Sequence, residues 1–474
     1  MVYKTHMANP DQVLKKTKIN IVDFVIVLSV VASPIVGALS LIMVFILTLY
    51  TLISCLKVKY FKGSTNFPFK LLGIIFISYF IYFSLHGLAL EDNLYQLKRA
   101  VQKIVPILII GILAFTTQDC TFSLNHKFFG TLTTWSLYLT FFFAVLIFVI
   151  DPQFIFMGHT LASKSLVFER LQMGTHNPLI FSIIMTTLGF LSLLSFEEKT
   201  FFGKITSLII LLICILIVFF WNGSRGPILV CLPLCIISTW YLKPNINKFY
   251  QQTNKKIFWV ILISTLFISF TFIYLNLIQQ SEVAARFING IISLFFDTVY
   301  LVNNNERIEI YGHEYAAQFP NDVSVLTRLI MWVNALEALS VKPIFGYGIS
   351  HKMDAVLPFI KKSSDSYHLF LNYNHLHNIF INHLISGGVF GFLILILYLF
   401  SAIFLIKRAN LKISRDSKYF IMIVLTSLML NGLTNVILMH ELLSHFFSML
   451  IFLFLICSKN ELKPMKVSAS RSIN

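Results

Sequence analysis

The stretch His375–Gly391, HLHNIFINHLISGGVFG, places polar side chains directly before an apolar run that continues to about residue 406. It contains three histidines, two asparagines and three glycines: His375, His377, His383, Asn378, Asn382, Gly387, Gly388 and Gly391. Residues that can carry protons are costly at a membrane boundary, so a cluster of them there indicates a functional site. A single histidine is explained equally well as a hydrogen-bonding residue among lipid headgroups.

The composition of the whole chain is that of a polytopic membrane protein. Of its 474 residues, 57% are hydrophobic and only 12% are charged, and the mean hydropathy is +0.79. A soluble domain needs more polar residues than this to cover its surface. Apolar runs of about 20 residues, the length that crosses a bilayer, recur along the chain. No charged or Gly/Ser-rich linker divides them, so we expect one membrane domain over residues 1–474.

We predict an all-α fold of about twelve transmembrane helices with one long periplasmic loop that contains helices. The predicted spans are about 19–33, 36–56, 71–90, 103–118, 130–150, 177–195, 205–221, 227–242, 258–278, 378–406, 419–438 and 442–457. The segment 378–406 also fits a tilted entry followed by a shorter crossing. The first apolar run follows a tail without a small-residue cleavage pattern, so we expect it to be retained.

The basic residues orient these spans. Tails and loops on the N-terminal side hold 24 of the 37 Lys and Arg residues, and the other side holds 13. Because cytoplasmic loops are enriched in Lys and Arg, both termini are expected in the cytoplasm. The same distribution explains the net charge of +16 without nucleic acid. The loop 91–102 and the long segment 279–377 then lie outside, and a loop as long as 279–377 is usually functional.

Arg225 lies in the sequence SRGP between two predicted spans, on the outer side. Gly226 allows a ligand to approach closely, and Pro227 begins a helix whose N-terminus favours an anion. An arginine near a helix end can also simply extend to lipid phosphates. A phosphate on a lipid carrier fits the local sequence.

Two further arginines lie on the predicted outer side. Arg328 begins the helical stretch RLIMWVNALEAL, with Trp332 one turn later on the same face. This pair can also be a surface cation–π contact. Arg170 precedes His176, after which Asn177 and Pro178 begin the next span.

Taken together, these motifs resemble those of the bacterial O-antigen ligases and their relatives, the O-antigen polymerases. In chain order they are Arg-Leu followed by Asn-Pro (Arg170, Asn177, Pro178), Ser-Arg-Gly (Ser224, Arg225, Gly226), Arg-x-x-x-Trp (Arg328, Trp332), and His-Asn, nine residues, then Gly-x-x-Gly (His377, Asn378, Gly388, Gly391). The resemblance covers about residues 70–440. The sequence departs from the ligase pattern at Phe392-Leu393, where ligases usually have Thr-Gly, and this bears on the choice between ligase and polymerase.

The resemblance implies a membrane glycosyltransferase of the GT-C type in the bacterial inner membrane, with its active site facing the periplasm. The donor would be a polysaccharide on undecaprenyl pyrophosphate, and the acceptor would be the lipid A-core of lipopolysaccharide. Arginine can stabilise the departing pyrophosphate without a metal. No Asp-x-Asp or acidic cluster occupies a plausible outer position, so we expect no metal and no other cofactor.

Within that expectation, the residues have distinct roles. Arg225 and Arg328 are the candidates for catalytic contacts with the pyrophosphate, and His377 is the candidate general base because a neutral imidazole can accept the acceptor's proton. The candidate substrate-binding residues are Arg170, His375, Asn378, Trp332 and His176. His383 is expected to tolerate replacement by Gln, and the glycines are expected to let helices approach closely.

Two alternatives remain open. An O-antigen polymerase joins repeat units on the same lipid carrier, needs the same donor chemistry and differs only in its acceptor. A polysaccharide transporter or flippase also has many spans and buried arginines, but its charges are expected near broken helices at mid-span. Here they lie at one face.

Overall fold

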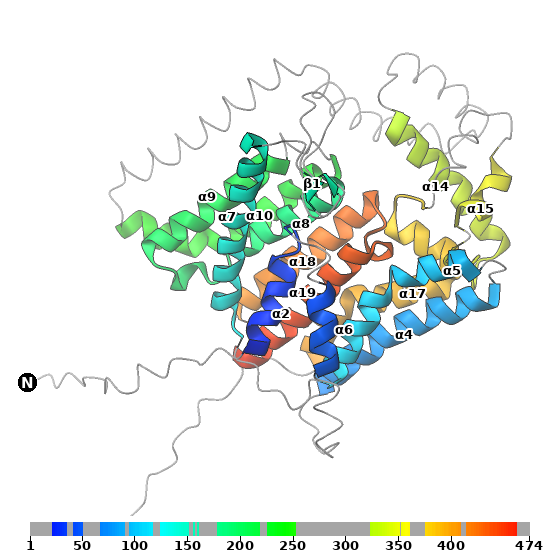
Figure 1. The fold of residues 1–474 in the computed structure, drawn as a ribbon, viewed down its shortest axis with the longest axis horizontal. Helices are drawn as coiled ribbons and strands as arrows, with labels where there is room; N and C mark the ends of the chain where they lie inside the picture. Colours follow the sequence, from blue (N-terminus) through cyan, green and yellow to red (C-terminus); the bar gives the residue numbers. More distant parts are fainter. Residues whose placement is uncertain are drawn as a thin grey trace, which may run out of the picture.

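The computed structural model describes residues 21–35, 41–50, 67–90, 94–116, 124–150, 155–156, 159–160, 178–218, 225–252, 323–350, 352–360, 375–408 and 414–461. These residues are helical except for connecting turns and a two-residue antiparallel pair, β1 (Ile155–Phe156) with β2 (His159–Thr160). The longer helices pack into one bundle (Figure 1). The predicted helical class is confirmed for this part of the chain.

Helices lie at eleven of the twelve predicted spans, where long apolar runs favour them. They are α2 (Ile21–Val31), the helix Leu41–Tyr50, α4 (Phe67–Leu90), α6 (Val105–Thr116), α7 (His126–Ile150), α8 (Pro178–Leu191), α9 (Phe201–Leu216), α10 (Arg225–Gln252), α17 (Ile379–Arg408), α18 (Arg415–Thr434) and α19 (Glu441–Glu461). The remaining predicted span, 258–278, lies outside the described residues.

Not every one of these helices is long enough to cross a membrane. Within the described residues, four segments are long and apolar enough, in α4, α17, α18 and α19. A fifth candidate is α5 (Leu94–Gln102) together with α6, two helices bent by 50° at a short break. The count of about twelve crossings therefore stays a prediction.

The predicted loop 91–102 is wrong in one respect, because Leu94–Gln102 forms the helix α5. This helix is amphipathic: Leu97 is buried, whereas Tyr95 is exposed and lies under the guanidinium of Arg99. The charges Lys98 and Arg99 suggested a loop, but they lie on the polar side of a helix that packs against α4.

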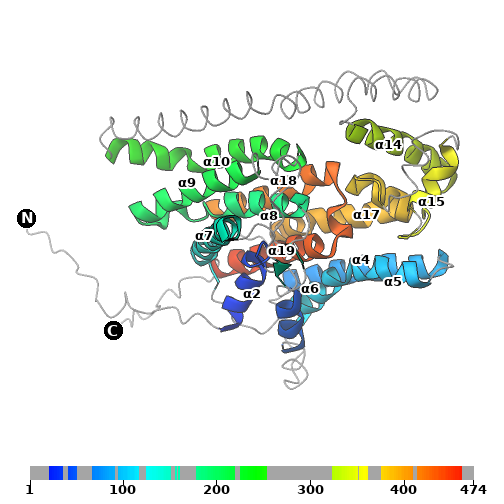
Figure 2. The ribbon, with the colours of Figure 1, turned by 45° about the horizontal axis from the view of Figure 1, so that its top comes forward.

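Helix α19 lies at the centre of the bundle (Figures 1 and 2). In its span Glu441–Ser458, 94% of the residues are buried, and its neighbours include α2, α6, α8, α17 and α18. A helix that is apolar on all sides is stable when other helices surround it. Outer helices such as α4 instead expose large apolar side chains, as expected where lipid covers them.

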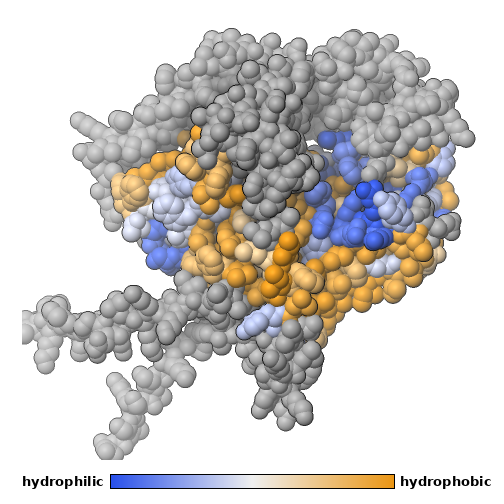
Figure 3. Space-filling model, in the orientation of Figure 1, coloured by the Kyte–Doolittle hydropathy of each residue, from blue (hydrophilic) through white to orange (hydrophobic). Residues whose placement is uncertain are grey.

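The long segment 279–377 contains helices, as predicted. Residues 323–360 form α14 (Val323–Val341), α15 (Lys352–Val356) and the 3-10 helix η6 (Leu357–Phe359). They pack beside α17 through a small apolar core of their own, and both ribbon views place them together. The face in Figure 3 shows hydrophilic surface near this junction and hydrophobic surface below it.

Helix α17 is interrupted at Gly388, where φ is 59° and ψ is −156°. The turn after α14 fills this interruption: the Tyr347 amide donates to the Ile385 carbonyl at 2.8 Å, and the Val389 amide donates to the Pro343 carbonyl at 2.9 Å. Backbone groups freed by a broken helix need such partners within a membrane protein. The break at Gly388 is compatible with a tilted entry followed by a shorter crossing over 378–406, which stays a prediction.

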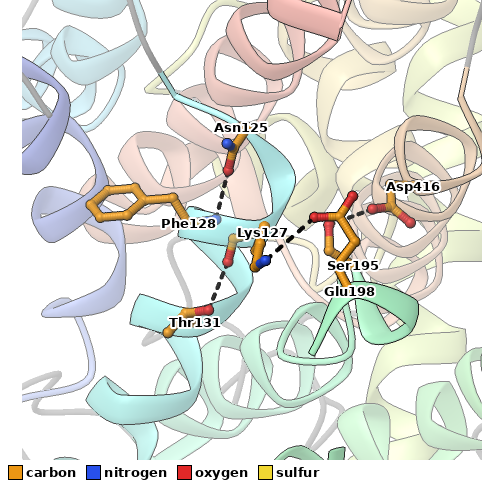
Figure 4. A network of polar contacts seen from close by, with 7 residues as sticks. All are labelled: Asn125, Lys127, Phe128, Thr131, Ser195, Glu198 and Asp416. Atoms are coloured by element: carbon orange, nitrogen blue, oxygen red, sulfur yellow. Dashed lines mark hydrogen bonds and ion pairs between the residues drawn. The ribbon is translucent and has the colours of Figure 1, made fainter. Parts of the chain in front are cut away.

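At one end of the bundle, polar contacts join several helix ends (Figure 4). Asp416 accepts hydrogen bonds from Ser195 and from Tyr241, the latter at 2.5 Å, and Lys127 lies 3.8 Å from Glu198. We name this the Asp416 end. The chain segments that meet here are among those that the alternation of spans put on one side, and the full arrangement of spans and loops stays a prediction.

Candidate functional site

The residues predicted to form the site differ in how far the structure describes them. Side chains are described for Arg328 and Trp332 in α14 and for His375, His377 and Asn378 before α17. Arg225 begins α10, but its side chain lies outside the described residues. Arg170 and His176 also lie outside them. The described residues lie at the end of the bundle opposite Asp416, which we name the histidine end.

Asn378 fixes the start of α17. Its side-chain oxygen accepts from the amides of Phe380 at 2.9 Å and Ile381 at 3.1 Å, as an N-cap residue does. Its side-chain nitrogen donates to the Leu433 carbonyl near the end of α18, at 3.1 Å. These contacts make Asn378 a positioning residue, and its predicted contact with substrate stays a prediction.

Trp332 connects α14 to the same segment, because its indole nitrogen donates to the Leu376 carbonyl at 2.7 Å. Leu376 is itself buried in the small core between these helices. The hydrogen bond holds the backbone between His375 and His377 against α14, the helix that carries Arg328. Two motifs that are about 45 residues apart in the sequence are thus held together.

His375 and His377 are in direct contact, with ring centroids 4.2 Å apart and planes at 80°. His377 has a φ of 51°, in the left-handed region that residues other than glycine seldom occupy. Such strain is maintained only where surrounding contacts fix the backbone, and it is frequent at functional sites. Here those contacts are the Asn378 cap and the Trp332 hydrogen bond.

Burial and positive neighbours keep both imidazoles neutral. Burial lowers the pKa of His377 to about 3, and the charges of His375 and Arg328 add to this effect. Burial also lowers the pKa of His375 to about 4, with further contributions from Lys352 and Lys103. The general base was expected to have a pKa near working pH. The empty site differs because burial disfavours the charged imidazoles and nearby bases add to this effect, and a bound anion would raise these pKa values.

Three basic residues at this end were not singled out from the sequence. Lys352, the first residue of α15, is 6% exposed, and burial lowers its pKa to about 7. Lys103 lies in the break between α5 and α6, and His440 follows the 3-10 helix η7 (Ile437–Met439). Burial and the charge of Lys103 lower the pKa of His440 to about 4. His440 was detectable as a histidine in an outer turn, whereas no motif marks Lys352.

The backbone of Arg225 also lies at the histidine end. A side chain at Gly226 would approach the Thr434 hydroxyl to 2.6 Å, so α10 begins in close contact with the end of α18. Asn378 contacts Leu433 at that same end. The starts of α10 and α17 therefore meet at one helix end, as the alternation of spans predicted.

The glycines of α17 allow the close packing that the sequence predicted. A side chain at Gly387 would approach the rings of Tyr82 and Phe83 in α4 to 3.0 Å. A side chain at Gly388 would overlap the Ile344 carbonyl in the turn after α14. Gly387 therefore brings α17 close to α4, and Gly388 brings it close to the turn after α14.

The expectation that His383 tolerates replacement is not supported by its surroundings. His383 is fully buried, with its Nε2 atom 2.5 Å from the Tyr79 hydroxyl and its Nδ1 atom 2.6 Å from the Ile379 carbonyl. It therefore connects α4 to the first turn of α17. The sequence placed it one helical run beyond the cluster, but it supports the position of that cluster.

A cavity of about 210 Å³ is lined mainly by apolar side chains from the helix Leu41–Tyr50, α6 and the start of α19. Its lining includes Val105, two residues after Lys103, and Glu441, the residue after His440. Within the described part of the chain, no three His, Cys, Asp or Glu residues gather as metal ligands. The site as described can hold an anion and accept a proton.

Comparison with known proteins relates this arrangement to a family. Residues 210–396 match a family model described as O-antigen ligase. An uncharacterized protein of Haemophilus influenzae is 35% identical over 97 residues, which are 20% of this chain and 24% of that protein. The chain thus aligns with about a quarter of that relative. The matched region contains Arg225, Arg328, His377 and Gly388, and over residues 210–396 this chain is similar to the O-antigen ligase family.

Proposed function

We propose that this protein is an O-antigen ligase of the bacterial inner membrane. It would transfer polysaccharide from undecaprenyl pyrophosphate to a hydroxyl group of the lipid A-core, at the periplasmic face and without a metal ion. The observation that carries this proposal is the contact of His377 with His375 in a buried cluster whose other charged members are cationic. The described candidate spans and the family support a multi-pass membrane enzyme.

In the proposed reaction, the acceptor oxygen attacks C1 of the sugar that is linked to the carrier. The bond between C1 and the phosphate oxygen breaks, and its electron pair remains on the undecaprenyl pyrophosphate. His377 takes the proton of the acceptor hydroxyl. Arg328 and Arg225 bind the leaving group, because charge-assisted hydrogen bonds stabilise the negative charge that develops on it.

The low pKa of His377 is consistent with this order of events. In the empty site the imidazole is neutral and can accept a proton, but it is a weak base. Binding of the pyrophosphate would offset the positive charge of Arg328 and raise the pKa of His377. The base would then become effective when the donor is bound.

The apolar cavity beside Lys103 supports a donor with a lipid chain. A polyprenyl pyrophosphate needs cationic groups for its head and an apolar surface for its chain, and the cavity lining includes Val105 and Glu441, which are close in the chain to Lys103 and His440. The exposed apolar side chains Ile42 and Phe45 line the cavity on the side of the helix Leu41–Tyr50.

The second candidate function is that of an O-antigen polymerase. The observation that favours it is Phe392-Leu393, where the ligase pattern has Thr-Gly. A strain that lacks this gene separates the two functions. Long polymer that accumulates on the lipid carrier indicates a ligase, whereas single repeat units on the carrier indicate a polymerase and contradict the proposal.

A further inference from the structure

Lys352 occupies a rigid position at the histidine end. It begins α15, which packs against both α14 and α17. The next residue, Met353, and Val356 are buried with Met331 of α14 and Leu376 in the small apolar core. The backbone of Lys352 is therefore held between the helix of Arg328 and the segment of His375. A charged side chain at such a place is usually paired or functional, because burial of a lone charge is unfavourable.

The charged groups around Lys352 are bases. Its charge acts on His375 and on His383 in α17, and the charge of Lys103 acts on Lys352 from the break between α5 and α6. Among the described residues, no carboxylate forms an ion pair with Lys352. Lys352 therefore has neighbouring bases and no anionic partner among the described residues.

A second observation also indicates a missing ligand. The Nδ1 atoms of His375 and of His440 are buried and have no hydrogen-bond partner among the residues that the structure describes. Buried polar atoms are nearly always satisfied by protein, water or a ligand. These two atoms lie on residues that are electrostatically coupled to Lys103. Unsatisfied histidine nitrogens and a buried lysine without a described anionic partner thus occur in the same cluster.

We infer that Lys352 is an additional pyrophosphate-binding residue of the donor site, whose ammonium group contacts the phosphate oxygens beside Arg328. This inference rests on the proposed function and extends it to a residue outside the recognised motifs. Cleavage of the C1–oxygen bond adds negative charge to the pyrophosphate, and a fixed buried cation stabilises that charge more than a solvated one would. Lys103 adds to the positive potential at the mouth of the site.

The inference makes a particular prediction about protons. With a pKa of about 7, Lys352 is partly neutral at pH 7.5 in the empty protein. A bound pyrophosphate raises this pKa, so binding takes up a proton from the buffer. The other described bases coupled to Lys352 are Lys103, His375 before α17 and His383 in α17. Replacement of Lys352 removes its share of the uptake and leaves theirs.

The experiment uses the full chain in phosphatidylcholine nanodiscs, titrated calorimetrically with geranylgeranyl pyrophosphate and with inorganic pyrophosphate. Titration at pH 7.5 in two buffers of different ionisation enthalpy gives the affinity and the proton uptake. Lys352→Met is expected to weaken binding of both probes by about tenfold or more and to reduce the uptake. Lys352→Arg should bind within a few-fold of the parent without that share of the uptake, because Arg is always protonated.

The matched control is Lys342→Met. Lys342 is an exposed lysine that lies over the ring of Tyr347, 4.9 Å from its centroid, at the end of α14. Its replacement removes the same charge from the same segment and should leave binding unchanged. Thermal unfolding gives a second control: removal of a buried unbalanced cation should keep or raise the melting temperature of the empty protein.

The possible results separate the inference from the proposed function. If the parent transfers glycan and binds both pyrophosphates, but Lys352→Met binds them equally well, the inference is wrong and the function stands. If Lys352→Met lowers the melting temperature of the empty protein, Lys352 has a structural partner and the inference fails. If nanodiscs rich in phosphatidylglycerol block the site as well as pyrophosphate does, its ligand is a lipid headgroup, which also contradicts the inference. If the parent neither transfers glycan nor binds pyrophosphate, both proposals fail.

Discussion

Replacement of Gly388 by Ala tests how the turn after α14 is attached to α17. Gly388 has a φ of 59°, and an added Cβ would overlap the Ile344 carbonyl. The unfavourable backbone conformation alone costs on the order of 1–3 kcal/mol for a residue with a side chain. The overlap would also displace the turn after α14, which makes four backbone hydrogen bonds to α17. At about 0.5–1.5 kcal/mol each, their loss adds roughly 2–6 kcal/mol.

Gly348→Ala is the matched control, because it separates strain from overlap. Gly348 also has a positive φ, of 96°, but a Cβ there would meet its nearest atom, Leu90 Cβ, at 3.6 Å. We expect Gly348→Ala to show the strain alone and Gly388→Ala to be less stable by about a further 2 kcal/mol or more.

Stability can be followed with a thiol-reactive dye, because the thiols of Cys214 and Cys231 are free and buried and become reactive on unfolding. Gly388→Ala should also lose transfer activity at temperatures where the protein is still folded, because Arg328 and Trp332 move with the turn. Equal melting temperatures for Gly388→Ala and Gly348→Ala would contradict the packing of the turn after α14 against the break in α17.

Three further predictions concern two hydrogen-bonded contacts and the pH dependence of stability. Tyr79→Phe leaves the buried His383 Nε2 atom without its partner and should lower the free energy of unfolding by about 1–3 kcal/mol. Tyr95→Phe, at an exposed position, should not lower it. Equal melting temperatures for these two variants would contradict the contact between Tyr79 and His383. Asp416→Asn weakens the contacts to Ser195 and Tyr241 and should lower the melting temperature but leave KM for the donor unchanged; a raised KM would argue against a purely structural role. In the folded protein His375 has a pKa of about 4, below its unfolded value of about 6.5. The unfolded state therefore binds more protons than the folded state between pH 6.5 and pH 4. The stability of the protein should fall as the pH drops through that window. Thermal unfolding at several pH values should show a smaller fall in His375→Asn, and an unchanged pH dependence would contradict the burial of this imidazole.

Much of the fold follows from local sequence. The apolar runs predict where helices lie, and Gly388 within an apolar run is consistent with a break. The sequence could not predict that the turn at residues 343–348 fills this break. The backbone groups that pair there are about 40 residues apart, and their pairing depends on tertiary packing. The helix α5 was missed because charged residues on one face of a short helix look like those of a loop.

The candidate site was predictable only in part. His377, Asn378, Arg328 and Trp332 stand in recognisable motifs, and the structure brings their segments together. Lys352 has no motif, and only its burial beside His375 and the charge of Lys103 distinguishes it. His383 looked peripheral, because nothing in the sequence indicates its contact with Tyr79, 304 residues away.

The role of His377 as the base is the central claim, and one experiment tests it most directly. Purified His377→Ala in lipid is mixed with donor glycan on its carrier and with acceptor, in the presence of chelator, and transfer is measured in a single turnover with donor bound. Loss of a general base should lower this rate by typically 10²–10⁴-fold. Pyrophosphate binding, which depends on the cations, should survive, and added imidazole should restore part of the rate. Transfer by His377→Ala near the parent rate, with donor bound equally well, would contradict the account.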